Sequence, residues 1–222
     1  MRIIRNLLVT LWVFTLTAPA LAGIEVGGTR LVFEAQKGMA SLSIKNPDKN
    51  TPYLIQSWLD NGDEKVIGKI PFLVTPPLFL LSAGQENQVR VINTALVPTD
   101  RESLYWLNIK SIAPGSSGSN QLQISVRTRI KMIYRPVAIK KTAADAYKQL
   151  TVARSGNRLT FTNPTAHYVS FFDVKVGGTA VDEPSMVAPF ATYSMNVSSS
   201  QVGKVSWRAI NDYGGRTEEV TR

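Results

Sequence analysis

The segment LQISVRTRIKMIYRP, residues 122–136, alternates between two kinds of side chain. Polar and basic residues fill the positions of one parity, and apolar residues fill most of the other: Leu122, Ile124, Val126, Ile130 and Met132. Because successive side chains of a strand point to opposite faces, this pattern predicts a long β-strand with one apolar and one basic face. Pro136 lacks an amide hydrogen, so we expect the strand to end there.

Similar short alternating runs recur along the chain, separated by Gly, Pro, Asn and Asp, and helical patterning is scarce. Strands of this length and spacing are typical of all-β sandwiches or barrels. The fold class predicted from the pattern is therefore all-β. Residues 137–150, VAIKKTAADAYKQL, are expected to form a linker with one short helical turn. Three tryptophans fall in predicted strands and are expected in a core: Trp58, Trp106 and Trp207.

The first 22 residues have the features of a secretory signal. Arg2 and Arg5 form a positive region before an apolar run, LLVTLWVFTLTA, and the small residues ALA stand before Gly23. This arrangement predicts cleavage after Ala22. A retained membrane anchor is the alternative, but the apolar run is short and ends in a cleavage-type triplet. No later segment is long and apolar enough to span a bilayer.

The chain is basic. Removal of residues 1–22 takes away two arginines and no acidic residue, so the formal net charge falls from +9 to +7. Excess positive charge favours nucleic acid, an anionic membrane surface or an acidic protein as the partner. Export argues against nucleic acid, and we expect none to be bound.

Catalysis has little material in this chain. There is no cysteine, which excludes a thiol nucleophile, a disulfide framework and thiolate metal ligands. The single histidine, His167, leaves almost nothing from which to build a Ser-His-Asp triad or a multi-histidine zinc site. The composition therefore argues against enzymes of these kinds, and we expect neither metal nor cofactor. His167 follows a turn in NPTAHYVS, and we expect it on the surface with no role.

Several spaced motifs, in order, resemble one family. They are GGTRLVFE at 27–34, PYLIQSWLD at 52–60, PFLVTPP at 71–77, DRESLYWLNIKSI at 100–112, RIKMIYRP at 129–136 and WRAINDYGG at 207–215. With these motifs the chain resembles the periplasmic pilus chaperones of the chaperone–usher type. The resemblance implies two immunoglobulin-like β-sandwich domains set at an angle, like a boomerang. It places them at residues 23–140, with the donor strand, and 141–222.

The resemblance implies a binding function in the periplasm. Such a chaperone captures and folds pilin subunits, which lack the last strand of their own sheet, by donor-strand complementation, and delivers them to an outer-membrane usher. It implies that Leu122, Ile124 and Val126 are the side chains that fill the groove of the subunit. Whether the free protein forms a homodimer that covers its own apolar strand is left open.

The resemblance also assigns charged residues. Arg30 and Lys131 are expected to bind the C-terminal carboxylate of the subunit, since arginine offers a planar fork and lysine a compact charge. Three further residues are expected to form a buried ion network between the domains: Glu102, Arg135 and Asp212. From periodicity alone, an apolar strand is usually half-buried in its own domain, and a single charge is usually solvated.

Two other classes of function were considered. A fimbrial structural subunit, or another secreted immunoglobulin-like binding protein, would also be rich in strands. Pilins commonly carry a cysteine pair and one incomplete domain, whereas this chain has no cysteine and the pattern of two domains. A secreted hydrolase would need a suitably placed pair of acidic residues, and Glu218 and Glu219, near the end of the chain, are expected to be solvated.

Overall fold

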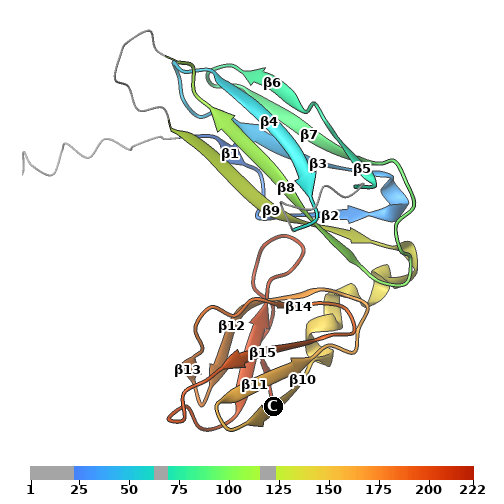
Figure 1. Ribbon diagram of the computed structural model, residues 1–222, viewed down its shortest axis with the longest axis vertical. Helices are drawn as coiled ribbons and strands as arrows, with labels where there is room; N and C mark the ends of the chain where they lie inside the picture. The colour runs from blue at the N-terminus through green and yellow to red at the C-terminus, as the bar shows by residue number, and fades with distance from the viewer. Residues whose placement is uncertain (1–22, 63–69, 116–123) are drawn as a thin grey trace, which may run out of the picture.

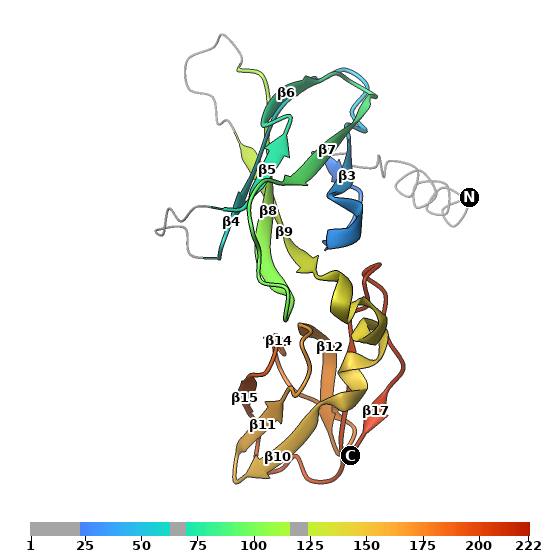
Figure 2. The same cartoon turned by 90° about the vertical axis from the view of Figure 1, so that its right-hand side faces the viewer.

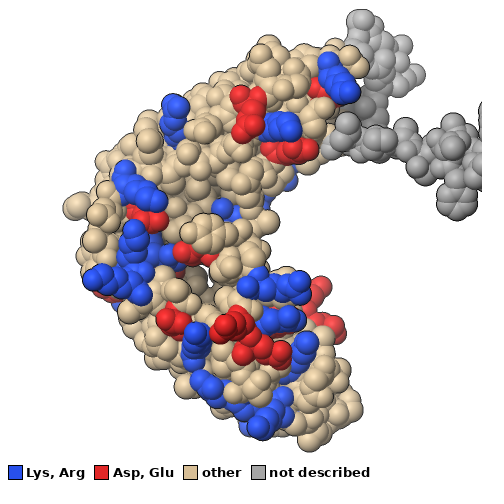
Figure 3. Space-filling model, turned by 180° about the vertical axis from the view of Figure 1, so that it is seen from behind, with Lys and Arg blue, Asp and Glu red and all other residues tan. Residues whose placement is uncertain are grey.

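The computed structural model describes residues 23–62, 70–115 and 124–222. Two β-sandwich domains are joined end to end, and the molecule bends between them (Figures 1 and 2). Seen from behind, the surface is hollowed on the inner side of the bend (Figure 3). Each domain has its own cluster of buried apolar residues. Within the described ranges, no helix is long and apolar enough to cross a membrane.

The first domain packs two sheets face to face. Their strand orders are β1–β3–β7–β5 and β2–β9–β8–β4–β6, and every pair is antiparallel except β2 with β9. A short 3₁₀ turn, Ala35–Lys37, follows β2. The strands are β1 (Glu25–Val26), β2 (Arg30–Glu34), β3 (Met39–Lys45), β4 (Tyr53–Asp60), β5 (Phe72–Thr75), β6 (Leu78–Leu81), β7 (Glu86–Asn93), β8 (Ser103–Ile112) and β9 (Ser125–Arg135).

The core of this domain follows from the period-two pattern, because each strand turns its apolar side chains toward the opposite sheet. The fully buried side chains come from both sheets: Phe33, Ile44, Ile55, Val89, Val91, Leu107 and Met132. The Phe33 ring packs edge-on against Phe72, with 5.1 Å between ring centroids. This packing makes the sandwich a rigid support for β9.

The second domain is a smaller sandwich. One sheet has the order β10–β11–β15, and the other has the order β13–β12–β16–β17, with β14 also paired to β12. Its core surrounds the fully buried Trp207, as expected for that tryptophan. The strands are β10 (Thr151–Ser155), β11 (Arg158–Thr162), β12 (Val169–Val176), β13 (Thr179–Ala180), β14 (Met186–Val187), β15 (Thr192–Asn196), β16 (Val205–Ala209) and β17 (Val220–Thr221).

The connection between the domains is more ordered than the sequence predicted. A 3₁₀ helix, η3, spans Val137–Gln149 directly after Pro136, where a linker with one short turn was expected. It buries Ala146 and Tyr147 in the core of the second domain. The Tyr147 carbonyl also accepts a hydrogen bond from Trp207 Nε1 at 3.0 Å. Tertiary packing, rather than a strong helical pattern, therefore explains its length.

Strand β9 pairs with β8 along nearly its whole length, but with β2 along its last part only. Strand β2 pairs with its last part, from Arg30 opposite Lys131 to Glu34 opposite Arg135. Along residues 125–130, β8 pairs on one side, and no described strand pairs on the other. The first half of β9 is thus a sheet edge that no described strand covers, and such an edge is a template for adding another strand.

Candidate functional site

The apolar face of β9 is exposed near the start of the strand and buried from Ile130 onward. Ile130 and Met132 are buried in the core of the first domain. Ile124 and Val126 occupy positions of the same parity as Ile130 and Met132. Yet Val126 is 53% exposed, and Ile124, just before the strand, is 67% exposed. Leu122, the third predicted groove-filling residue, lies outside the described residues. The open edge therefore carries two apolar side chains that the domain itself does not bury.

Two cations lie where this open edge stops. Arg30 and Lys131 are paired residues of the parallel strands β2 and β9. Burial lowers the pKa of Lys131, and repulsion from Arg30 lowers it further. Burial also lowers the pKa of Arg30, an effect partly offset by the charge of Asp212. Two partly desolvated like charges favour an anion that contacts both.

Each cation reaches across to the second domain. The Arg30 guanidinium donates a hydrogen bond from Nη1 to the carbonyl of Ile210 at 3.1 Å. Lys131 Nζ donates to Ser170 Oγ at 3.3 Å and lies 5.9 Å from the ring centroid of Trp106. Among the described residues, neither cation forms an ion pair. The hydrogen-bond partners that hold them are neutral, and the charge of Asp212 offsets that of Arg30 only in part.

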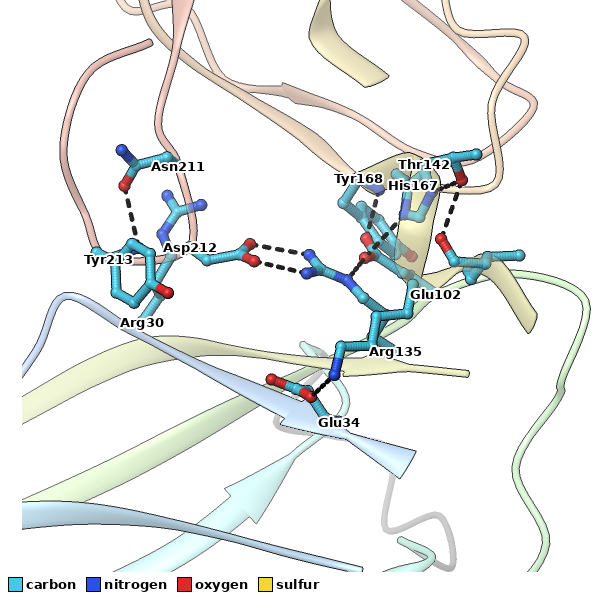
Figure 4. A network of polar contacts seen from close by, with 12 residues as sticks. Arg30, Glu34, Glu102, Arg135, Thr142, His167, Tyr168, Asn211, Asp212 and Tyr213 are labelled. Atoms are coloured by element: carbon cyan, nitrogen blue, oxygen red, sulfur yellow. Dashed lines mark hydrogen bonds and ion pairs between the residues drawn. The ribbon is translucent and has the colours of Figure 1, made fainter. Parts of the chain in front are cut away.

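A second set of charges joins the domains. Arg135, the last residue of β9, donates from Nε to Glu102 Oε1 at 2.6 Å. It also forms a bidentate pair with Asp212, at 2.6 and 2.8 Å (Figure 4). Burial acts to lower the pKa of Arg135, but hydrogen bonds and charges from Asp212 and Glu102 outweigh it and raise the pKa above its ordinary value. The guanidinium thus stays charged between two carboxylates from different domains.

The expectation for His167 was wrong. Its side chain is buried, with the residue only 2% exposed, and it lies within the domain junction (Figure 4). Nδ1 is 3.0 Å from Glu102 Oε1, and Nε2 is 2.8 Å from Thr142 Oγ1 on η3. The neighbouring amide of Tyr168 donates to the other oxygen of Glu102 at 2.8 Å. His167 and the Tyr168 amide of the second domain therefore both contact the Glu102 carboxylate of the first domain.

The charges of the junction surround a small cavity. It measures about 200 Å³, and residues of both domains line it, among them Arg30, Arg135 and Asp212. Within the described part of the chain, no group of three or more His, Cys, Asp or Glu side chains lies close enough to hold a metal ion. The arrangement is suited to holding an anionic group near Arg30.

The basic face of β9 has partners that the sequence did not reveal. Asp60 accepts hydrogen bonds from Arg129 at 2.6 Å and from the Asn108 amide at 2.7 Å. The Asn108 oxygen in turn accepts one from Arg127 Nε at 2.8 Å. Burial acts to raise the pKa of Asp60, but hydrogen bonds from Arg129, Asn108 and the Gly62 amide outweigh it and lower the pKa. These bonds tie the half of β9 that lacks β2 to β8 and β4.

Two tryptophans belong to this outer face rather than to the core. Trp58 and Trp106 are half-buried, contrary to the expectation that they lie in the core. The Arg127 guanidinium lies 5.3 Å from the ring centroid of Trp58, and that of Arg129 lies 4.5 Å from that of Trp106. Such distances allow cation–π attraction, so the rings cover the stems of the cations.

Two family models together cover nearly all of the described chain. The model described as "Pili and flagellar-assembly chaperone, PapD N-terminal domain" matches residues 23–140. The model described as "Pili assembly chaperone PapD, C-terminal domain" matches residues 145–221. The chain belongs to the PapD family of pilus-assembly chaperones. The expected all-β fold with two domains is confirmed, and so is the expectation of a chaperone rather than an enzyme.

Named relatives of this PapD-family chain agree. It is 36% identical over 205 residues to the chaperone protein FimC of Escherichia coli O6:H1, covering 90% of this chain and 84% of that protein. It is 35% identical over 211 residues to the chaperone protein LpfB of Salmonella typhimurium, covering 90% and 88%. These are chaperones and not fibre subunits, so the structural-subunit alternative is not supported.

Solved structures of PapD-family proteins share the fold. A structure of the Salmonella enterica SafA pilin in complex with the SafB chaperone matches with a TM-score of 0.84 at 36% identity, covering 92% of this chain and 98% of that one. The E. coli chaperone DraB matches with a TM-score of 0.80 at 36% identity, covering 90% and 95%.

Proposed function

We propose that this chaperone captures pilin subunits in the periplasm by lending them the edge of β9. The observation that carries the proposal is the junction of an open strand edge with two cations, Arg30 and Lys131, that form no ion pair among the described residues. Addition of a strand to an exposed sheet edge is an established mode of recognition, and chaperone–pilin donor-strand complementation is one of its instances. The complex of SafA with SafB, a structure similar to this chain, supports the same pairing here.

The direction of the added strand follows from the position of β2. Because β2 already pairs with β9 from Lys131 onward, a subunit strand on the open edge must end near Arg30. Only a strand that runs parallel to β9 brings its carboxyl terminus to this point. A terminal carboxylate offers two oxygens, which suit the fork of Arg30 and the point charge of Lys131. Fixing that end also fixes the register, so that Ile124 and Val126 face the groove.

The energies indicate that the anchor is needed. Full burial of a large aliphatic side chain contributes about 1.5–3 kcal/mol, so Ile124 and Val126 together contribute roughly 3–6 kcal/mol. Association itself costs an estimated 4–15 kcal/mol. The two side chains therefore leave little net affinity, even with Leu122 added. Backbone pairing and the carboxylate contact supply the remainder.

The proposal includes the route to this site. Residues 1–22 direct export and are removed, which leaves domains at 23–140 and 141–222. The captured subunit then passes to an outer-membrane usher, where the extension of another subunit replaces β9. A strand edge without cover also tends to pair with itself, and size-exclusion chromatography of the free protein distinguishes a self-capped pair from a monomer.

The test is capture of subunits encoded beside this chain's gene. The chaperone is co-expressed with them, and co-purifying proteins are identified by mass spectrometry. Replacing Arg30 or Lys131 by alanine should abolish capture and leave the circular dichroism spectrum and the unfolding midpoint unchanged. Capture that survives both changes would refute the anchor.

A further inference from the structure

The cation pair is completed by the second domain. Ser170 lies on β12 and is 2% exposed, and its Oγ accepts the hydrogen bond from Lys131. The Ile210 carbonyl, after β16, accepts the hydrogen bond from Arg30. The Ile210 amide donates to the Ser170 carbonyl at 2.9 Å, so the two contacts come from adjacent segments of one sheet. The second domain thus presents one fixed surface to both cations.

The groups around Arg30, Lys131 and Ser170 provide more hydrogen-bond donors than acceptors. An ammonium group has donors only, so the bond between Lys131 and Ser170 uses an oxygen lone pair and leaves the hydroxyl hydrogen of Ser170 unused. No described residue accepts that hydrogen. The described residues therefore offer a guanidinium, an ammonium and a hydroxyl here, while the Ile210 carbonyl is already engaged by Arg30 and the Asp212 carboxylate by Arg135. A surplus of donors around a buried position suits an anion with several lone pairs.

We propose that Ser170 is a third hydrogen-bond donor to the subunit's terminal carboxylate, so that the binding site is shared by the two domains. This inference rests on the proposed function of Arg30 and Lys131. One carboxylate oxygen lies toward Arg30, and the other accepts from Lys131 and from the Ser170 hydroxyl. Ser170 accordingly discriminates between a free chain end and an amide, whose nitrogen has no lone pair to accept with.

The site also depends on the angle between the domains. Ile210 and Asp212 are two residues apart, and the carboxylate of Asp212 is held by Arg135. The same short segment thus carries one contact to Arg30 and one to the ion network. Movement of the second domain would separate Ser170 from Lys131 while leaving Arg30 and Lys131 together on their own sheet.

The experiment compares two synthetic peptides that copy the C-terminal strand of the captured subunit, one with a free carboxylate and one with a terminal amide. Their dissociation constants are measured by calorimetry for the wild type and for Ser170→Ala, Ser170→Thr and Lys131→Met. Ser170→Ala should weaken binding of the free acid about ten-fold, as expected for loss of a hydrogen bond to a charged group. Binding of the amide should not change. Ser170→Thr keeps the hydroxyl and should retain the preference for the acid.

The outcomes separate this inference from the proposed function. An acid preference that falls in Lys131→Met but not in Ser170→Ala refutes the role of Ser170 and preserves the anchor. The same loss in Ser170→Thr as in Ser170→Ala refutes the hydroxyl and points to packing. Equal binding of both peptides by the wild type, or a wild type that captures no subunit, refutes the anchor and this inference together.

Discussion

Replacing Arg135 by methionine tests what holds the two domains at their angle. Methionine keeps much of the volume of the side chain but removes the charge that lies between Glu102 and Asp212. Only 1% of the Glu102 side chain is exposed, so its carboxylate cannot regain water while the domains stay docked. His167 and the Tyr168 amide still contact it.

The size of the effect can be worked out from the exposure of the two carboxylates. Removing one partner of a buried ion pair costs about 3–5 kcal/mol. The Asp212 side chain is 44% exposed and can be rehydrated, so loss of its contact with Arg135 accounts for about 1 kcal/mol or less of this cost. Because separation of the domains would expose Glu102 to water, the variant relieves this cost by undocking. We therefore expect Arg135→Met to shift the docking equilibrium by about two to three orders of magnitude.

The assay is small-angle scattering together with chemical denaturation. Arg135→Met should raise the radius of gyration and leave the unfolding of each domain close to the wild type. Asp212→Asn is the matched control, because Arg135 keeps Glu102 and the asparagine oxygen still accepts a hydrogen bond. Its scattering should match that of the wild type. If Arg135→Met also gives the wild-type scattering curve and the wild-type denaturation midpoint, the ion network does not set the domain angle.

Two further predictions concern β9. Val126→Glu should prevent subunit capture in a pull-down. It should leave the unfolding midpoint of the free protein unchanged, because Val126 is 53% exposed there. Capture of the subunit at wild-type yield would contradict the placement of Val126 in the groove. The lowered pKa of Asp60 means that its contribution to stability is present above its unfolded pKa and is lost as pH falls through the folded value. Wild type should therefore be more stable than Asp60→Asn at neutral pH, and their denaturation midpoints should converge below about pH 4; a constant difference between them would exclude the charge of Asp60 as the cause.

The parity of β9 was predictable from the sequence, but the division of its apolar face was not. Ile124, Val126, Ile130 and Met132 share one parity, and nothing local distinguishes the two that are exposed from the two that are buried. The difference arises because Ile130 and Met132 pack in the core of the first domain, whereas Ile124 and Val126 do not. Which part of a strand the core covers is a property of the tertiary fold, and alternation along one strand carries no information about it.

The polar contacts divide in the same way. Motif positions placed Glu102, Arg135 and Asp212 together as expectations, because each stands in a spaced motif of the family. His167 has no such motif, and its partner Glu102 is 65 residues away in the sequence. Asp60 and Arg129 are 69 residues apart. A single sequence does not reveal pairs at this distance, so neither contact was predicted, and His167 was expected on the surface.

Capture of a subunit and docking of the domains should favour each other. The carboxylate site takes Arg30 and Lys131 from the first domain and, in our proposal, Ser170 from the second, so a bound chain end contacts both. A ligand that binds the docked arrangement more tightly must stabilise it by the same factor by which docking strengthens binding. The free-acid peptide should therefore lower the radius of gyration of Arg135→Met toward the wild-type value, and the amide peptide should do so less. Equal compaction by both peptides would place the coupling along β9 itself rather than at the chain end.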